Sequence, residues 1–240
     1  MNDSSQYGLL ATTLAALQQR MAAARPHPSA GNISIGQPVA SQGLSRRPPK
    51  LIGASKTQPV AMLEAAIALG LADFGENKVQ EATAKWPALK IKSPQVRLHL
   101  IGPLQSNKAV DAVDLFDVIH TVDRPKIADA LASACDKLGK RPAMLIQVNT
   151  GKEPQKSGVA PYEAANLLSH CQARNLPIVG LMCVPPEDQD PTPHFAMLKQ
   201  MAETFGLAEL SMGMSGDFEK AIALGATMVR IGTALFGSRN

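Results

Sequence analysis

The chain has 240 residues and a mass of 25.4 kDa, with 45% hydrophobic and 18% charged residues, a size that suits one large α/β domain. A net charge of only +4, with no aromatic residues interleaved in a basic stripe, excludes a nucleic-acid-binding protein. The spacing of the three cysteines (Cys135, Cys171, Cys183), the absence of a long apolar run and the polar N-terminus exclude a disulfide framework, a membrane protein and a secreted protein, so we expect a cytoplasmic location.

The first fifty residues divide into an apolar-periodic part and a part without periodicity. Leucines and Met21 recur at helical spacing and predict a helix over residues 8–24. Residues 25–50 are rich in Pro, Gly, Ser and Ala, and a loop of this length is uncommon inside a compact domain. We therefore expect residues 1–24 to form a helix that packs on the main domain, and residues 25–50 to form a mobile insert outside its core.

From residue 51 onward, short apolar runs alternate with helical patterns. The sequence predicts strands over 51–55, 72–74, 96–101, 116–121, 143–149, 178–183, 207–211 and 228–231. Helices are expected between them, over 59–70, 77–86 (ended by Pro87), from 106, and over 125–138, 161–173, 194–205 and 216–224. This alternation within 51–240 predicts a single α/β (β/α)8 TIM barrel. An open doubly wound sheet would carry a Gly-rich first turn, which Ser55-Lys56-Thr57-Gln58 lacks.

Lys56 ends the first predicted strand, where a barrel places its active site. Strand alternation puts Lys56 on the same face as Ile52 and Ala54, toward the barrel interior. Burying an ammonium group among apolar side chains costs several kcal/mol unless it is paired or neutralised, and a neutral amine can attack a carbonyl. A solvent-exposed lysine just beyond a strand explains this segment equally well.

The seventh and eighth units end in turns suited to a phosphate. Small residues from Ser211 to Ser215 precede a helix and leave backbone N–H groups free, and Gly232 and Thr233 form a second such turn. Phosphate sites built from these two loops recur in barrels. Arg230 lies at the last strand's end on the inward face, which implies a partner for its charge. Ser215 also fits a simple helix N-cap, and the two roles are compatible.

The five histidines show no metal-ligand spacing, so no metal site is expected, and His99 and His120 are interpreted as core or mouth residues. A reactive lysine, a phosphate cup and an inward arginine together indicate a phosphorylated aldehyde. Pyridoxal phosphate is the common cofactor bound in this way, as a Schiff base on a lysine.

Five motifs carry a resemblance to a known family: Ala54-Ser55-Lys56-Thr57, Asp73-Phe74-Gly75-Glu76-Asn77, Ile101-Gly102-x-Leu104-Gln105-Ser106-Asn107-Lys108, Ser211-Met212-Gly213-Met214-Ser215 and Val229 to Gly237. In order and spacing, from Leu51 to Arg239, they resemble the YggS/PROSC family of pyridoxal phosphate homeostasis proteins. The resemblance implies the fold of the alanine racemase N-terminal domain. It also implies these cofactor contacts: the Schiff base on Lys56, the phosphate on Ser211, Ser215, Gly232 and Thr233, the ring nitrogen facing Arg230, and Asn77 near the ring.

The sequence keeps one further lysine of the family and replaces another. Lys156 matches a family lysine of less certain role, and Gln58 replaces a second lysine that often follows the Schiff-base lysine. The replacement weakens any role for a neighbouring amine in cofactor transfer.

The resemblance and the residues favour a non-catalytic carrier, and the alternative is a pyridoxal phosphate-dependent amino-acid racemase. Racemisation needs a second proton carrier, which alanine racemases supply as a tyrosine of the second subunit. Here the tyrosines, Tyr7 and Tyr162, lie outside the motifs, and only nine residues follow Ile231, so no further β domain is expected. An arginine facing the ring nitrogen also makes the ring a poorer electron sink.

A third function, a Schiff-base aldolase, would require an acid/base pair near Lys56, and the sequence indicates none. For the carrier we expect a monomer whose partners are pyridoxal phosphate and the apoenzymes that use it. Neither a nucleic acid nor a membrane is expected among them.

Overall fold

The computed structural model describes residues 3–26, 48–153 and 155–237, so most of the predicted insert at 25–50 lies outside the described residues. Within these ranges, eight parallel strands close into a barrel in the order β1 to β8, which confirms the predicted (β/α)8 fold. The strands are β1 (Lys50–Ala54), β2 (Asp73–Glu76), β3 (Arg97–Leu100), β4 (Val118–Val122), β5 (Ala143–Val148), β6 (Ile178–Cys183), β7 (Glu209–Ser211) and β8 (Met228–Ile231).

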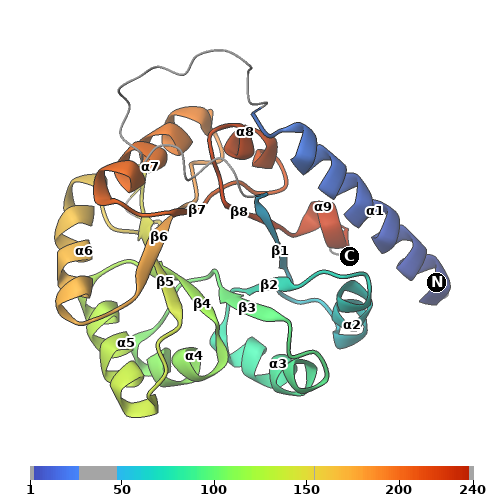
Figure 1. The fold of residues 1–240 in the computed structure, drawn as a ribbon, viewed down its shortest axis with the longest axis horizontal. Coiled ribbons are helices and arrows are strands. Elements are labelled where there is room, and N and C mark those ends of the chain that lie inside the picture. Colours follow the sequence, from blue (N-terminus) through green and yellow to red (C-terminus); the bar gives the residue numbers. More distant parts are fainter. Residues whose placement is uncertain (1–2, 27–47, 154, 238–240) are drawn as a thin grey trace, which may run out of the picture.

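Helices form a ring around the barrel (Figure 1). They are α2 (Val60–Ala68), α3 (Val79–Lys92), α4 (Ala109–Leu115), α5 (Pro125–Leu138), α6 (Ala164–Ala173), α7 (Thr192–Phe205), α8 (Phe218–Ala223) and α9 (Thr233–Phe236), with the 3-10 turns η2 (Ser106–Lys108) and η3 (Pro161–Glu163). None of the described helices is both long and apolar enough to cross a lipid bilayer.

The N-terminal helix α1 (Asp3–Ala23) lies alongside α8 and α9 (Figure 1). Its buried leucines and Met21 join the core shared by the barrel and its helices. The guanidinium group of Arg20 donates two hydrogen bonds to Glu219, at 2.8 and 2.9 Å, and lies 4.7 Å from the ring centroid of Phe218. Helix α1 begins at Asp3, earlier than the predicted residue 8. The sequence pattern missed this first turn because its residues are polar and carry no apolar periodicity.

The predicted end of a helix at Pro87 is wrong, because α3 continues through this residue to Lys92. A proline in a helix interior removes one backbone hydrogen bond and costs about 3 kcal/mol. Trp86 and Leu89, on either side of it, are both buried in the core. Burying two side chains of this size contributes about 1.5–3 kcal/mol each, which offsets the cost of the proline.

The barrel interior has an apolar part and a polar part. Ile52 and Met182 belong to a small separate cluster of buried apolar side chains, which confirms that Ile52 points inward. His99, His120 and Ser211 are fully buried polar residues of β3, β4 and β7. Buried polar side chains are stable when each has a hydrogen-bond partner. These three residues are hydrogen-bonded to one another.

Gly180→Ala tests the close packing of β6 on β7. A Cβ atom at position 180 would lie 2.0 Å from the Glu209 carbonyl oxygen, a backbone atom that cannot move aside easily. We expect this substitution to lower the free energy of unfolding by about 3 kcal/mol in urea denaturation. The control is Gly8→Ala in α1, where no atom lies within 4 Å and alanine favours the helix. Equal stability of the two variants would contradict the close approach of these two strands.

Candidate cofactor site

A cavity of about 420 Å³ opens at the carboxyl ends of the strands. Every predicted site residue except Ser211 lines it, and so do several residues that the sequence did not single out. The full lining is Ala54, Lys56, Gln58, Asn77, Ile101, Val184, Met214, Ser215, Gly216, Arg230, Gly232, Thr233 and Gly237. The apolar members were missed because a half-buried aliphatic side chain at a strand end carries no chemical signal of its own.

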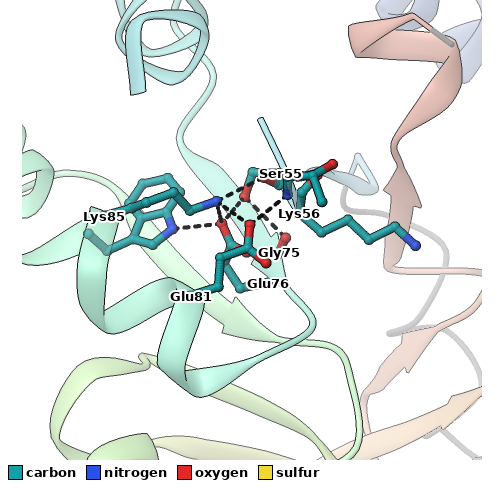
Figure 2. Close-up of polar contacts among 8 residues, drawn as sticks. Ser55, Lys56, Gly75, Glu76, Glu81 and Lys85 are labelled. Atoms are coloured by element: carbon teal, nitrogen blue, oxygen red, sulfur yellow. Dashed lines mark hydrogen bonds and ion pairs between the residues drawn. The ribbon is translucent and has the colours of Figure 1, made fainter. Parts of the chain in front are cut away.

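Lys56 is the second residue after β1, and its side chain lines the cavity. Figure 2 shows this side chain extending away from the polar cluster behind β1, with its amine at the far end. Within the described residues the amine has neither a hydrogen bond nor an ion pair. An amine without a partner, at the wall of a cavity, is positioned to react with a carbonyl group that enters it.

On the side away from the cavity, the Lys56 segment is fastened to β2 and α3 by a group of contacts that we call the Glu76 network (Figure 2). The network comprises Ser55, Thr57, Glu76, Glu81, Lys85 and Trp86. The Oε1 atom of the fully buried Glu76 accepts hydrogen bonds from Ser55 Oγ at 2.8 Å and Trp86 Nε1 at 2.9 Å, and forms an ion pair with Lys85 Nζ at 2.7 Å. These contacts hold Ser55 in place, one residue before Lys56.

The same network reaches the residue after Lys56. Lys85 Nζ also donates to the Ser55 carbonyl oxygen at 3.1 Å and to Glu81 Oε1 at 2.9 Å. Glu81 Oε1 in turn accepts the Thr57 N–H at 2.6 Å, and Thr57 has the uncommon positive φ of 63°. Burial alone would raise the pKa of Glu81, but hydrogen bonds from Lys85 and Thr57 hold that pKa below its ordinary value. An ionised Glu81 therefore keeps the turn around Lys56 fixed.

Opposite Lys56, the loops after β7 and β8 present backbone donors to the cavity. Among the described residues, the N–H groups of Ser215, Gly216, Gly232 and Thr233 have no acceptor. Gly213 has a φ of 93°, and a Cβ atom there would lie 2.6 Å from the Ala221 side chain, so this loop requires glycine. N–H groups without an acceptor, on residues that line one cavity, fit the oxygens of a phosphate.

Ser215 is not the N-cap of the following helix. Helix α8 begins at Phe218 with Asp217 in the N-cap position. Ser215 Oγ instead accepts the N–H of Ala234 at 3.3 Å, and thereby joins the loop after β7 to α9. The serine thus links the two loops that carry the free N–H groups.

Arg230 lines the cavity from β8 and is 5% exposed. The expected partner of its charge is not a carboxylate: Nη1 donates to Ser211 Oγ at 2.6 Å and Nη2 donates to the Cys183 carbonyl oxygen at 2.8 Å. Burial lowers the pKa of Arg230, while the field of Asp217 partly opposes this change. A guanidinium group held by neutral acceptors keeps its charge available to a ligand in the cavity.

Two residues singled out by the family resemblance do not line the cavity. Ser211 is fully buried in β7, below Arg230, and is hydrogen-bonded to it. Lys156 forms an ion pair with Glu153 at 2.8 Å in the loop after β5 and does not line the cavity. His99 and His120 are buried strand residues as expected, and the described residues contain no cluster of metal-ligating side chains.

Comparison with known proteins places this site in context. Residues 41–240 match the family model "Alanine racemase, N-terminal domain". The chain is 40% identical over 213 residues to the pyridoxal phosphate homeostasis protein of Synechocystis sp., with 84% of this chain and 97% of the relative aligned. It is 42% identical over 215 residues to the protein of the same name from Pseudomonas aeruginosa, with 84% and 90% aligned.

A solved structure supports the same relationship. PipY of Synechococcus elongatus, with PLP bound, is 35% identical to this chain and superimposes with a TM-score of 0.74. The match covers 95% of this chain and 100% of PipY.

Proposed function

The chain belongs to the family of pyridoxal phosphate homeostasis proteins, and on this basis we propose that it stores and delivers the cofactor through a reversible Schiff base on Lys56. One observation carries the proposal. The unpartnered amine of Lys56 and the unfilled N–H groups of the β7 and β8 loops face the same cavity. An aldehyde and a phosphate on one small molecule match these two groups.

Each residue has a separate part in holding the cofactor. When bound, pyridoxal phosphate supplies an aldehyde that a lysine amine captures reversibly, with release of water. Ser215 and the backbone of Gly232 and Thr233 would hold the phosphate, Arg230 would face the ring nitrogen, and Asn77 would lie beside the ring. Ser211, assigned to the phosphate by the resemblance, is better placed to act through Arg230, because it is hydrogen-bonded to that side chain.

The carrier role, rather than racemisation, is supported by what surrounds the amine. Racemisation requires a second group that carries a proton on the opposite face of the substrate. The described lining of the cavity contains no Tyr, His, Cys, Asp or Glu, and its titratable side chains are Lys56 and Arg230. Tyr7 and Tyr162 are 44% and 79% exposed and do not line it. We accordingly propose a non-catalytic, monomeric carrier that serves apoenzymes.

The loaded protein is expected to leave free amino acids unchanged. Purified protein saturated with pyridoxal phosphate would be incubated with L-alanine and other L-amino acids, and the products separated by chiral chromatography. We expect D-isomer formation at the rate given by the same concentration of free cofactor. A rate of about 1 per second or more, typical of enzymes, would instead establish the racemase.

A further inference from the structure

A continuous hydrogen-bonded chain crosses the barrel interior and ends at Arg230. Asp73 Oδ1 lies 2.8 Å from His99 Nε2, and His99 Nδ1 lies 2.9 Å from His120 Nε2. His120 Nδ1 lies 2.9 Å from Ser211 Oγ, to which Arg230 donates at 2.6 Å. We call these five residues the interior chain. They come from five different strands, so the barrel itself brings them together.

The interior chain joins the two ends of the barrel. Asp73 is the first residue of β2, at the amino ends of the strands, and its side chain is 17% exposed. Arg230 lines the cavity at the carboxyl ends. Between them, His99, His120 and Ser211 are completely buried. A change at the exposed end therefore has a direct physical route to the residue that faces the cavity.

The carboxylate of Asp73 fixes the direction of the three hydrogen bonds that lead from it to Ser211. Because an ionised carboxylate only accepts, His99 must carry its proton on Nε2, and a neutral His99 then accepts on Nδ1. His120 must donate from Nε2 and accept on Nδ1, so the Ser211 hydroxyl donates to His120. The lone pairs of Ser211 are thereby turned toward Arg230, which only donates. The proton order that Asp73 sets thus leaves the lone pairs of Ser211 Oγ free to accept the hydrogen bond from Arg230.

The electrostatics of the chain agree with neutral imidazoles. Burial lowers the pKa of His99 and lowers the pKa of His120 still further. Burial alone would raise the pKa of Asp73, but the hydrogen bond from His99 and nearby positive charges hold that pKa below its ordinary value. Asp217, the carboxylate whose field acts on Arg230, accepts a hydrogen bond from the Met214 N–H at 2.6 Å.

We propose that Asp73, His99, His120 and Ser211 are positioning residues that hold the guanidinium group of Arg230 in register with the cofactor ring. This inference rests on the proposed function, since it concerns how the same site holds pyridoxal phosphate. None of the four residues touches the cavity except through Arg230. Their effect on the cofactor is transmitted by the proton order of the chain.

The first test measures the affinity for pyridoxal phosphate by its visible absorption. Asp73→Asn removes the charge that fixes the proton order, and Ser211→Ala removes the acceptor of Arg230. We expect each substitution alone to weaken binding about tenfold, the upper range for residues coupled through a network. The double variant should also be weakened about tenfold, and not a hundredfold, because the second change acts on a chain that is already broken.

The matched control is Asp117→Asn. Asp117 precedes β4 and is paired with Lys90 at 2.7 Å, without a bond to the interior chain. This substitution should change the affinity less than about twofold. Wild-type affinity in Asp73→Asn, or multiplied effects in the double variant, would overturn the proposal while the binding function itself stands.

A second measurement needs no substitution. Nitrogen-15 resonances of the histidines in the unmodified protein report which ring nitrogen carries the proton. We expect His99 and His120 both to be neutral with the proton on Nε2, and the His99 signals to move when pyridoxal phosphate is added. A proton on Nδ1 of either ring would refute the proton order on which the inference depends. His99 signals that stay unchanged when the cofactor is added would refute the coupling of the interior chain to the cofactor. Failure of the wild-type protein to bind pyridoxal phosphate would instead refute the proposed function.

Discussion

Lys56→Ala is expected to abolish covalent attachment of pyridoxal phosphate while leaving the barrel folded. The phosphate loops and Arg230 remain in this variant, so the cofactor still binds, but only through non-covalent contacts. We expect the affinity to fall about a hundredfold, which corresponds to about 2.7 kcal/mol. The measurement is borohydride reduction of the loaded protein followed by peptide mass mapping, which reports the attachment residue directly.

Lys156→Ala is the matched control for this experiment. Lys156 is also a lysine in a loop after a barrel strand, but it is paired with Glu153 and does not line the cavity. This variant should trap as much cofactor as the wild type, on the peptide that contains Lys56. Cofactor trapped on another lysine in Lys56→Ala, at wild-type yield, would show that the Schiff base forms elsewhere.

The barrel was predictable because its signals are local. Apolar runs of strand length, helix starts at Pro125 and Pro161, and glycines after helices all lie within one βα unit. The cavity residues were predictable for the same reason, since they follow strand ends in short motifs. Ser211 marks the limit: the sequence placed it beside the phosphate loop, whereas strand alternation turns its side chain down toward His120 and Arg230.

The Glu76 network could not be predicted from the sequence. Glu81 and Lys85, four residues apart on a helix, have the pattern of an ordinary exposed ion pair. Nothing in the sequence indicates that α3 packs its Lys85 amine onto Glu76, or that Trp86 donates to the same oxygen. These contacts depend on how α3 lies across β1 and β2, which is a tertiary relation. The interior chain depends in the same way on the closure of the barrel.

Lys85→Met is expected to destabilise the protein strongly. The substitution leaves the carboxylate of Glu76, which is completely buried, without its positive partner, and Glu76 Oε2 already has no hydrogen bond. Breaking a buried ion pair in this way costs about 3–5 kcal/mol. Urea denaturation measures the loss. The matched control on the same helix is Lys92→Met, whose ion pair with Glu64 is exposed and should be worth less than about 1 kcal/mol.

The double variant Lys85→Met with Glu76→Gln separates charge from packing. With no buried charge left, most of the lost stability should return, since a buried ion pair is often replaceable by neutral groups. The hydrogen bonds from Lys85 to Ser55 and Glu81 remain absent, so the turn around Lys56 is still released. We therefore expect a stable protein with a reduced yield of borohydride-trapped cofactor. A wild-type yield of trapped cofactor in the double variant would mean that the turn holds Lys56 in place without Lys85. A Lys85→Met variant as stable as Lys92→Met would contradict the burial of the ion pair between Lys85 and Glu76.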